Sequence, residues 1–249
     1  MTGTDTTINR WIRHYHPATD ATARLVCLPH AGGSATFFFP AARALAPDVD
    51  VLSIQYPGRQ DRRAEPLLDS IEALAAPVAA ALTADHDGRP LTLFGHSMGA
   101  LVAFEVATRL EAAGITPRSL IASGRQAPTS PTPEDLPTGD REAAAHLLSL
   151  SGTSPSLLED DEMLQMILPA LRADFRAVST YRYTERPPLT TPIAVFAGES
   201  DPRTSAAEIA GWADMTTGDF TVRMFPGGHF YLSDHPGLVT EALRSHLKG

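Results

Sequence analysis

The stretch LTLFGHSMGALVAFEVATRLEAAG, residues 91–114, runs an apolar strand almost directly into a long helix. At the joint Gly95-His96-Ser97-Met98-Gly99 forms a G-x-S-x-G pattern. The flanking glycines remove the Cβ atoms that would clash in so sharp a turn, so the serine projects from the end of a sheet. Free amide groups at the start of the helix favour negative charge beneath that serine. The pattern predicts that Ser97 is a nucleophile; the alternative is a tight turn that only packs a helix.

Short apolar runs alternate with helical patterns along the rest of the chain. The runs are rich in Val, Ile, Leu and Phe, are bounded by Gly, Pro or Asp, and predict buried strands at 24–30, 50–57, 91–95, 119–123, 192–198 and 220–226. Helices are expected at 35–45, 70–82, 98–113, 205–213 and 237–247. This alternation predicts a mostly parallel sheet with helices on both faces. The 249 residues, 43% of them hydrophobic, fit one α/β domain over 1–249.

One region interrupts this rhythm. After the strand at 119–123 comes SGRQAPTSPTPEDLPTGD, dense in Pro, Ser and Thr, followed by helical patterns near 140–150, 156–163 and 163–178. About sixty residues separate the flanking strands, whereas a simple crossover needs about a dozen. Long excursions of this kind are often lids or binding loops. We therefore expect a lid insertion at about 127–187, with an insertion of no special role as the alternative.

Two loops further along the chain carry groups that would activate the serine. A serine hydroxyl is a poor nucleophile at neutral pH and needs a base, and around such turns the chain order is Ser, acid, His. PIAVFAGESDPRTS places Asp201 after the strand at 192–198, and FTVRMFPGGHFYL places His229 after the strand at 220–226. The carboxyl ends of parallel strands meet at one edge of a sheet, so Ser97, Asp201 and His229 should converge there as a catalytic triad.

Neighbouring residues compete for these roles. Glu199 lies closer to the predicted strand end than Asp201, and a two-residue error in the strand boundary would exchange them. His96 lies inside the turn, and its side chain should point elsewhere. His235 precedes a proline and resembles the entry to the last helix. The remaining histidines outside the strand-end loops are expected at the surface: His14, His16, His86, His146 and His246.

A tetrahedral intermediate on Ser97 would need two amide donors for its oxyanion. The Met98 N–H directly follows the nucleophile. In LVCLPHAGGSATFF a strand ends before His30-Ala31-Gly32-Gly33, and the glycines let backbone amides approach a ligand closely. We expect the Ala31 N–H to be the second donor, against a glycine-rich turn that binds nothing. The chain has no G-x-x-x-x-G-K-[ST] phosphate loop.

Composition excludes several other classes of protein. The formal net charge of −9 offers no basic surface for nucleic acid. The N-terminal residues have no apolar core typical of a signal peptide, and no stretch reaches the roughly 18 apolar residues of a membrane helix. Cys27 is the single cysteine, so no intrachain disulfide can form. These features favour a cytoplasmic protein that binds neither nucleic acid nor membrane.

Motifs spread over nearly the whole chain resemble one family. LPHAGGSATFF, IQYPGRQDR, LFGHSMGALVAFEVA, LRADF, GESDP and PGGHFYL, in this order, look like the type II thioesterases of polyketide and nonribosomal peptide biosynthesis. The resemblance implies an α/β-hydrolase fold with a helical lid. It also implies editing hydrolysis of acyl thioesters from the phosphopantetheine arm of acyl or peptidyl carrier proteins. We expect a monomer, and we expect no metal or other cofactor.

Residue by residue, the resemblance supports Ser97, Asp201 and His229 as the triad and Ala31 and Met98 as oxyanion donors. Three alternatives stay open: a carboxylesterase or lipase of small esters, an integrated product-releasing thioesterase domain, and a non-enzymatic binding protein. Carrier proteins of this family are typically acidic, so docking on a negative chain needs local positive charge. Two arginine clusters are candidates for it: Arg59, Arg62 and Arg63; and Arg172, Arg176, Arg182 and Arg186.

Overall fold

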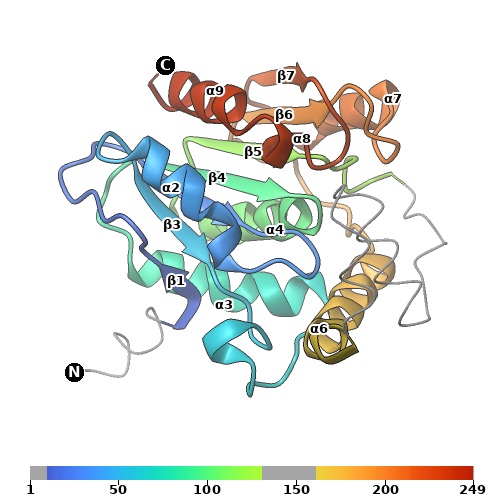
Figure 1. Ribbon diagram of the computed structural model, residues 1–249. Helices are drawn as coiled ribbons and strands as arrows, with labels where there is room; N and C mark the ends of the chain where they lie inside the picture. The colour runs from blue at the N-terminus through green and yellow to red at the C-terminus, as the bar shows by residue number, and fades with distance from the viewer. Residues whose placement is uncertain (1–9, 131–160, 249) are drawn as a thin grey trace.

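The computed structural model describes residues 10–130 and 161–248, with side chains of the second range from residue 165 (Figure 1). Within these ranges the chain forms a seven-stranded sheet in the order β1-β3-β2-β4-β5-β6-β7. Its strands are β1 (Ile12–Arg13), β2 (Arg24–Leu28), β3 (Asp50–Ile54), β4 (Leu91–His96), β5 (Ser119–Ser123), β6 (Ile193–Gly198) and β7 (Phe220–Phe225). β1 pairs antiparallel with β3, and every other pairing is parallel.

Helices cover both faces of the sheet (Figure 1). They are α2 (Phe39–Leu45), α3 (Ile71–Ala84), α4 (Met98–Ala112), α6 (Asp161–Thr180), α7 (Ala206–Ala210), α8 (Tyr231–Asp234) and α9 (Pro236–Lys248). Short 3-10 turns lie at Ala35–Phe38, Gln60–Arg62 and Gly211–Met215. α3 and α4 lie side by side on one face, and α2 and α9 pack together on the other.

The alternation of side chains along each strand divides the apolar residues between two cores. On β2, Val26 and Leu28 join the core under α3 and α4, whereas Leu25 and Cys27 join the core under α2 and α9. β6 divides in the same way. Strands buried on both faces read as continuous apolar runs, which is why these strands could be recognised in the sequence.

The structure confirms the predicted α/β class, and each predicted strand is present within a few residues. β1 was missed, because a two-residue antiparallel edge strand leaves no apolar run to detect. The helix predicted at 205–213 is divided into α7 and a 3-10 turn. The helix expected at 140–150 lies outside the described residues, as does most of the one expected at 156–163, while 163–178 lies within α6.

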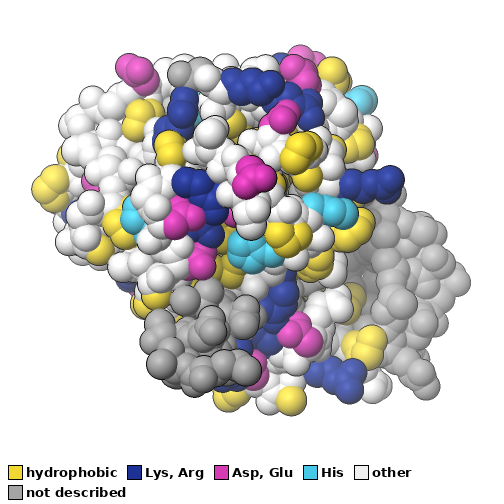
Figure 2. Space-filling model, turned by 90° about the vertical axis from the view of Figure 1, so that its left-hand side faces the viewer, with side chains coloured by type: hydrophobic (Ala, Val, Ile, Leu, Met, Phe, Trp, Pro, Cys, Tyr) yellow, Lys and Arg dark blue, Asp and Glu magenta, His cyan; other side chains and the backbone are white. Residues whose placement is uncertain are grey.

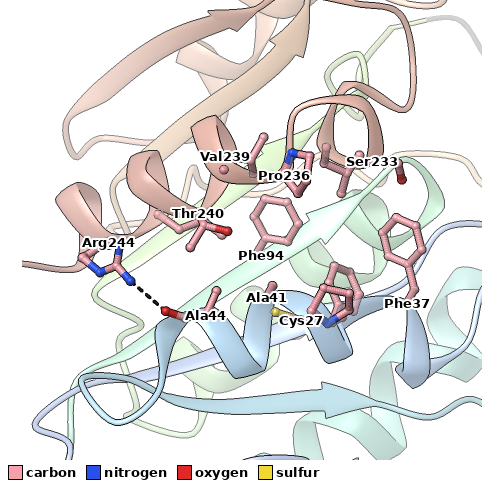
Figure 3. Close-up of a pocket in the computed structure, with 15 residues that line it drawn as sticks. Cys27, Phe37, Ala41, Ala44, Phe94, Ser233, Pro236, Val239, Thr240 and Arg244 are labelled. Atoms are coloured by element: carbon pink, nitrogen blue, oxygen red, sulfur yellow. Dashed lines mark hydrogen bonds between the residues drawn. The ribbon is translucent and has the colours of Figure 1, made fainter.

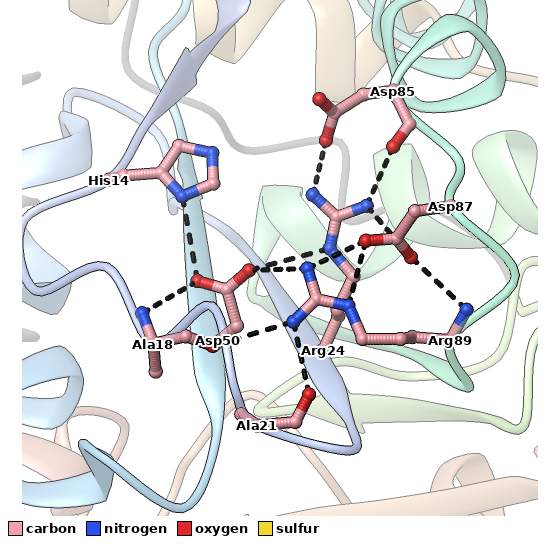
Figure 4. Close-up of polar contacts among 8 residues, drawn as sticks. All are labelled: His14, Ala18, Ala21, Arg24, Asp50, Asp85, Asp87 and Arg89. Carbon is pink, nitrogen blue, oxygen red and sulfur yellow. Dashed lines mark hydrogen bonds and ion pairs between the residues drawn. The ribbon is translucent and has the colours of Figure 1, made fainter.

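A network of ion pairs closes the end of the sheet where the strands begin (Figure 4). Arg24, at the start of β2, is buried and pairs with Asp85 and Asp50. Arg89 reaches Asp50 at 3.0 Å and Asp87 at 2.7 Å. Figure 2 looks onto this side of the molecule, where basic, acidic and histidine side chains are interspersed with hydrophobic ones. The network neutralises buried charge far from the carboxyl ends of the strands.

An apolar cavity of about 620 Å³ lies between α2 and α9 (Figure 3). Its floor includes Cys27 of β2 and Phe94 of β4, and Arg244 donates a 2.7 Å hydrogen bond to the Ala44 carbonyl across the helix pair. Burial raises the pKa of the Cys27 thiol, which disfavours the reactive thiolate. The residues lining the cavity include none of the predicted catalytic groups.

Glu105 of α4 contacts residues in the segment that follows α6. Its carboxylate is 2% exposed, pairs with Arg186, and accepts hydrogen bonds from Arg109 at 2.6 Å and the Tyr181 hydroxyl at 2.9 Å. Burial alone would raise the pKa of Glu105, but these donors outweigh burial and the pKa is lowered. The carboxylate therefore stabilises the folded protein at neutral pH, and this contribution is lost as the pH falls through the lowered pKa.

We predict that Glu105→Ala lowers the free energy of unfolding by about 2–3 kcal/mol at neutral pH, because it leaves two half-buried guanidinium groups and the buried Tyr181 hydroxyl without their shared acceptor. Urea unfolding measures this, and the difference from wild type should shrink at acidic pH. Glu241→Ala, which removes the exposed pair with Arg244, is the control and should cost at most about 1 kcal/mol. Equal effects of the two substitutions would contradict this account.

Candidate active site

Ser97 occupies a strained turn between β4 and α4. Its backbone has φ 54° and ψ −115°, in the positive-φ region that residues with a side chain rarely adopt. Helix α4 begins at once, with the Ala100 amide donating to the Ser97 carbonyl at 3.0 Å. The Ser97 amide donates to the Ser123 carbonyl of β5 at 2.8 Å, which fixes the turn against the neighbouring strand. The side chain is thus held at the carboxyl end of the sheet.

The first turn of α4 lies directly against the backbone that ends β2. A Cβ atom added at Gly99 would stand 2.1 Å from the Leu28 carbonyl oxygen, so only glycine permits this approach. The loop that follows Leu28 carries Ala31, and both Ala31 and Met98 are buried in the same core. In the described part of the chain, neither the Ala31 nor the Met98 amide has a hydrogen-bond partner. Both predicted oxyanion donors are therefore available beside the serine turn.

Asp201 and His229 lie in contact. The Nδ1 atom of His229 is 2.8 Å from Asp201 Oδ2, and both side chains are almost fully buried. The other carboxylate oxygen of Asp201 accepts a hydrogen bond from the Arg203 amide at 2.9 Å. Because Nδ1 is used in this way, Nε2 is the ring nitrogen left to exchange a proton with a reacting group.

Close packing of two loops brings this pair together. A Cβ atom at Gly198, the last residue of β6, would lie 2.2 Å from the Gly228 carbonyl oxygen. The Ser200 amide also donates to the Gly227 carbonyl at 2.9 Å. The loop after β6 is thereby pressed against the loop after β7. Glu199, the competing acid, is exposed, and Asp201 is the one that contacts His229.

Ser97 and His229 both lie next to the Ser123–Gly124 segment at the end of β5. The Ser123 carbonyl accepts the Ser97 amide, and a Cβ atom on the next residue, Gly124, would lie 3.3 Å from Cε1 of His229. The strands that carry Ser97 and Asp201 both end at this edge, on the side of the sheet where α6 lies (Figure 1). The three predicted triad residues thus occupy one edge of the sheet.

Two further histidines surround His229, and the sequence analysis did not anticipate their position. The ring of His96 lies 5.0 Å from that of His229, and His30 lies 5.8 Å from His96. The Nδ1 atom of His96 is 2.9 Å from the Ser123 hydroxyl, which in turn is 2.6 Å from the Tyr231 hydroxyl. Both added rings form a buried wall beside the imidazole of His229.

Burial keeps this wall uncharged. It lowers the pKa of His30 to about 3, with help from the nearby His229 and Arg59, and it lowers the pKa of His96 well below the usual value. Of these three histidines, His229 is the one whose ring contacts a carboxylate, that of Asp201. No set of three or more His, Cys, Asp or Glu side chains in the described ranges is arranged to hold a metal ion.

A serine on a strained turn, an imidazole with a carboxylate partner and two available amides together suit acyl transfer. A model of the thioesterase domain matches residues 23–247. The chain belongs to the thioesterase family. It is a thioester hydrolase with an α/β-hydrolase fold. Among the described helices, none combines the length and apolar character needed to cross a membrane.

Several thioesterases are similar to this chain along most of their length. Thioesterase PikA5 of Streptomyces venezuelae is 48% identical over 240 residues, which cover 95% of this chain and 85% of PikA5. The type II thioesterase BorB from the borrelidin biosynthetic cluster is 46% identical, with a TM-score of 0.87 over 95% of this chain and 97% of BorB. YbtT, a type II thioesterase from the yersiniabactin NRPS/PKS pathway, is 34% identical, with a TM-score of 0.85 over 96% and 98% of the two chains.

We predict that Gly99→Ala lowers kcat/KM for a small acyl thioester by about a hundredfold, because a displacement of about 1 Å in a catalytic geometry has that effect. The added methyl must push α4 and the Leu28 carbonyl apart. Gly114→Ala is the control, since it lies just beyond the other end of α4, where an added Cβ meets nothing within 4 Å. That variant loses some stability through its positive φ but should keep its turnover; full activity of Gly99→Ala would contradict the argument.

Proposed function

We propose that this thioesterase hydrolyses acyl thioesters carried on the phosphopantetheine arm of acyl or peptidyl carrier proteins. The observation that carries the proposal is the buried Asp201–His229 pair at the sheet edge that also bears Ser97. The origin of similar proteins supports the substrate class, because BorB is a type II thioesterase from the borrelidin biosynthetic cluster and YbtT is one from an NRPS/PKS biosynthetic pathway. We also propose an editing role, which is the removal of stalled or wrongly loaded acyl groups from such carriers.

The acylation step would use the groups already described. Ser97 Oγ attacks the thioester carbonyl carbon while His229 Nε2 takes the hydroxyl proton, and Asp201 holds the imidazolium. The carbonyl oxygen becomes an oxyanion that accepts hydrogen bonds from the Ala31 and Met98 amides. The intermediate collapses as the C–S bond breaks, and the pantetheine sulfur leaves as a thiol with the proton from His229.

Deacylation repeats the same proton transfers with water. His229 takes a proton from a water molecule, whose oxygen attacks the acyl-serine carbonyl carbon. The second tetrahedral intermediate breaks the C–O bond to Ser97, and the proton returns from His229 to the serine oxygen. The products are a free carboxylic acid and the regenerated enzyme. Burial of the Asp201–His229 pair favours this chemistry, because electrostatic interactions are stronger where water is excluded.

The remaining elements of the proposal concern access and location. We propose that residues 127–187 form a lid over the acyl group, with α6 as its described helix. A lid suits a long, thin arm because it can form a channel and close behind the substrate. We further propose that the enzyme acts as a monomer in the cytoplasm, and that it needs no metal or other cofactor.

The test is hydrolysis of a panel of short acyl groups loaded on a carrier protein, with matched oxyesters in parallel. We predict broad, slow hydrolysis of the carrier thioesters and weaker hydrolysis of the oxyesters, because thiolate is the better leaving group. Ser97→Ala should lose at least about a thousandfold in kcat, since removing the nucleophile of a triad costs up to about 10⁶ in another enzyme. Ser179→Ala on α6 is the control and should behave as wild type. Retained turnover in Ser97→Ala, or a preference for the oxyesters, would contradict the proposal.

The two arginine clusters differ in how many of their side chains could contact a carrier protein. Arg59 and Arg62 are buried and paired with Asp174 and Glu65, so these two arginines of the first cluster are unsuited to meeting a partner. Arg63 is exposed and has no ion-pair partner among the described residues. It lines a cavity of about 310 Å³ together with residues of the Ala31 loop and of α6.

In the second arginine cluster, the side chains described next already have partners within the protein. Arg186 is held by Glu105, and Arg176 pairs with Asp69 at 3.3 Å on the surface. Arg182 is exposed and donates to the Ser179 carbonyl at 2.7 Å. Arg63 therefore combines exposure, a free positive charge and proximity to the proposed oxyanion loop, and we propose it as a contact for the acidic carrier.

We predict that Arg63→Glu lowers kcat/KM on an acyl-carrier substrate by about tenfold, equivalent to about 1.4 kcal/mol, through KM. The same variant should hydrolyse acyl-N-acetylcysteamine as wild type does, because that substrate has no carrier. Arg43→Glu, an exposed reversal on α2, is the control for net charge. Equal losses on both substrates, or an equal loss in Arg43→Glu, would argue against docking at Arg63.

A further inference from the structure

A carboxylate from α6 reaches the loop that carries Ala31. Asp174 is fully buried, and its Oδ2 atom accepts a 2.7 Å hydrogen bond from the Gly32 amide. The same oxygen pairs with the Arg59 guanidinium. Gly32 directly follows Ala31, the proposed oxyanion donor. A group 142 residues further along the chain therefore holds the peptide next to the reacting centre.

Arg59 is itself fixed by the loop that follows β3. Its guanidinium donates to the Pro57 carbonyl at 2.7 Å, and its own carbonyl accepts a hydrogen bond from the Gln55 side chain at 3.2 Å. The amide oxygen of that same Gln55 side chain accepts from the Ala35 amide at 2.8 Å. The segment between β2 and α2 is thus held at two points, Gly32 and Ala35, by one connected set of polar side chains.

Ala31 lies immediately before the first of these points. The Gly33 amide donates to the His30 carbonyl at 2.9 Å, which closes a turn around Ala31 and Gly32. Because the hydrogen bond to Asp174 fixes the plane of the Ala31–Gly32 peptide, it limits how the neighbouring Ala31 amide can rotate. Hydrogen-bond donors for an oxyanion are effective only when their direction is set in advance.

We propose that Asp174 is a positioning residue for the oxyanion hole: through Gly32 and Arg59 it holds the Ala31 amide in its working direction, and only while α6 is seated against the sheet. The inference rests on the proposed donor role of Ala31. The proposal makes the oxyanion hole depend on the position of α6. If α6 moved away, the Gly32 amide would lose its acceptor and Arg59 would lose its counter-ion. The insertion would then control catalytic competence as well as access.

Placing the Asp174 carboxylate in the core has an energetic cost. Burial raises the pKa of Asp174, and the Arg59 cation and the Gly32 amide oppose that rise. The rise remains, so these two partners reduce the cost of burying the charge but do not remove it, and they do so with α6 in place. A buried carboxylate is weak evidence for added stability, since apolar groups of similar volume often serve a core as well.

The experiment compares Asp174→Asn with wild type on a small acyl thioester, which removes any dependence on the carrier. Asparagine keeps the size of the side chain but loses the charge that orients Gly32 and Arg59. Asp69→Asn is the matched control, because Asp69 also pairs with an arginine of α6, Arg176, but at the exposed surface. Asp174→Glu is the second variant; it keeps the charge and displaces the oxygen by one methylene group.

We expect kcat of Asp174→Asn to fall by about a hundredfold, the lower end of the loss seen when one oxyanion donor is removed in another enzyme. KM should stay within about twofold, and the pH midpoint of kcat/KM should not move, because His229 is untouched. Affinity for an acyl trifluoromethyl ketone, which forms the tetrahedral adduct, should fall in parallel with kcat/KM. Affinity for the corresponding thioether, which has no carbonyl, should be unchanged. Asp69→Asn should match wild type, and Asp174→Glu should lie between the two.

A structural role alone would give a different result. If Asp174→Asn and Asp174→Glu lower thermal stability while the folded fraction keeps wild-type kcat, the proposal is overturned. It is also overturned if ketone and thioether lose affinity equally. If Asp174→Asn does not fold, Asp174→Glu decides by the same ratio of affinities. Failure of wild type to bind the ketone through Ser97 would instead count against the proposed mechanism, which separates the two outcomes.

Discussion

The contact between the first turn of α4 and the backbone at the end of β2 is the constraint on which the site depends. At Gly99 the two backbones are so close that no side chain fits between them. This contact sets the serine turn, with its positive φ at Ser97, beside the loop that carries Ala31. The strain at one residue is offset by burial of a whole helix against the sheet. The proposed nucleophile and the proposed amide donors are thus positioned by packing that belongs to the fold itself.

Several buried carboxylates in the described part of this protein contact nitrogen groups from distant parts of the chain. Asp201 meets His229, Asp174 meets Arg59, and Glu105 meets Arg186. The last two pairs connect the loop after β3 to α6, and α4 to the segment after α6. An unpaired buried charge is costly, so these pairs favour one seating of α6 over others. The insertion is therefore coupled electrostatically to the elements that carry the proposed chemistry.

The sequence predicted those features that depend on local pattern. Buried parallel strands leave continuous apolar runs, so the sheet was predictable. The glycines of the G-x-S-x-G pattern indicate a sharp turn, so the position of Ser97 was predictable as well. The loops after β6 and β7 could be aligned with that edge because parallel strands end together. The choice of Asp201 over Glu199 needed the strand boundary, which the pattern gives only within about two residues.

Features that depend on tertiary contact were not predictable from the sequence. Arg59 and Arg62 read as surface charges, yet both are buried, because their partners Asp174 and Glu65 cannot be identified from local pattern. His96 was expected to point away from the site, and its ring instead lies against His229. Asp174 occurs in the LRADF motif, but nothing in a helix sequence shows that one carboxylate reaches a loop 142 residues earlier.

The most direct test of the account is rapid-quench mass spectrometry of the enzyme mixed with an acyl-loaded carrier protein. The account predicts a transient acyl adduct on the peptide that contains Ser97, formed and lost at rates that match steady-state turnover. Turnover with no adduct at that residue, or with the acyl group found on another side chain, would contradict the proposed nucleophile and the geometry built around it.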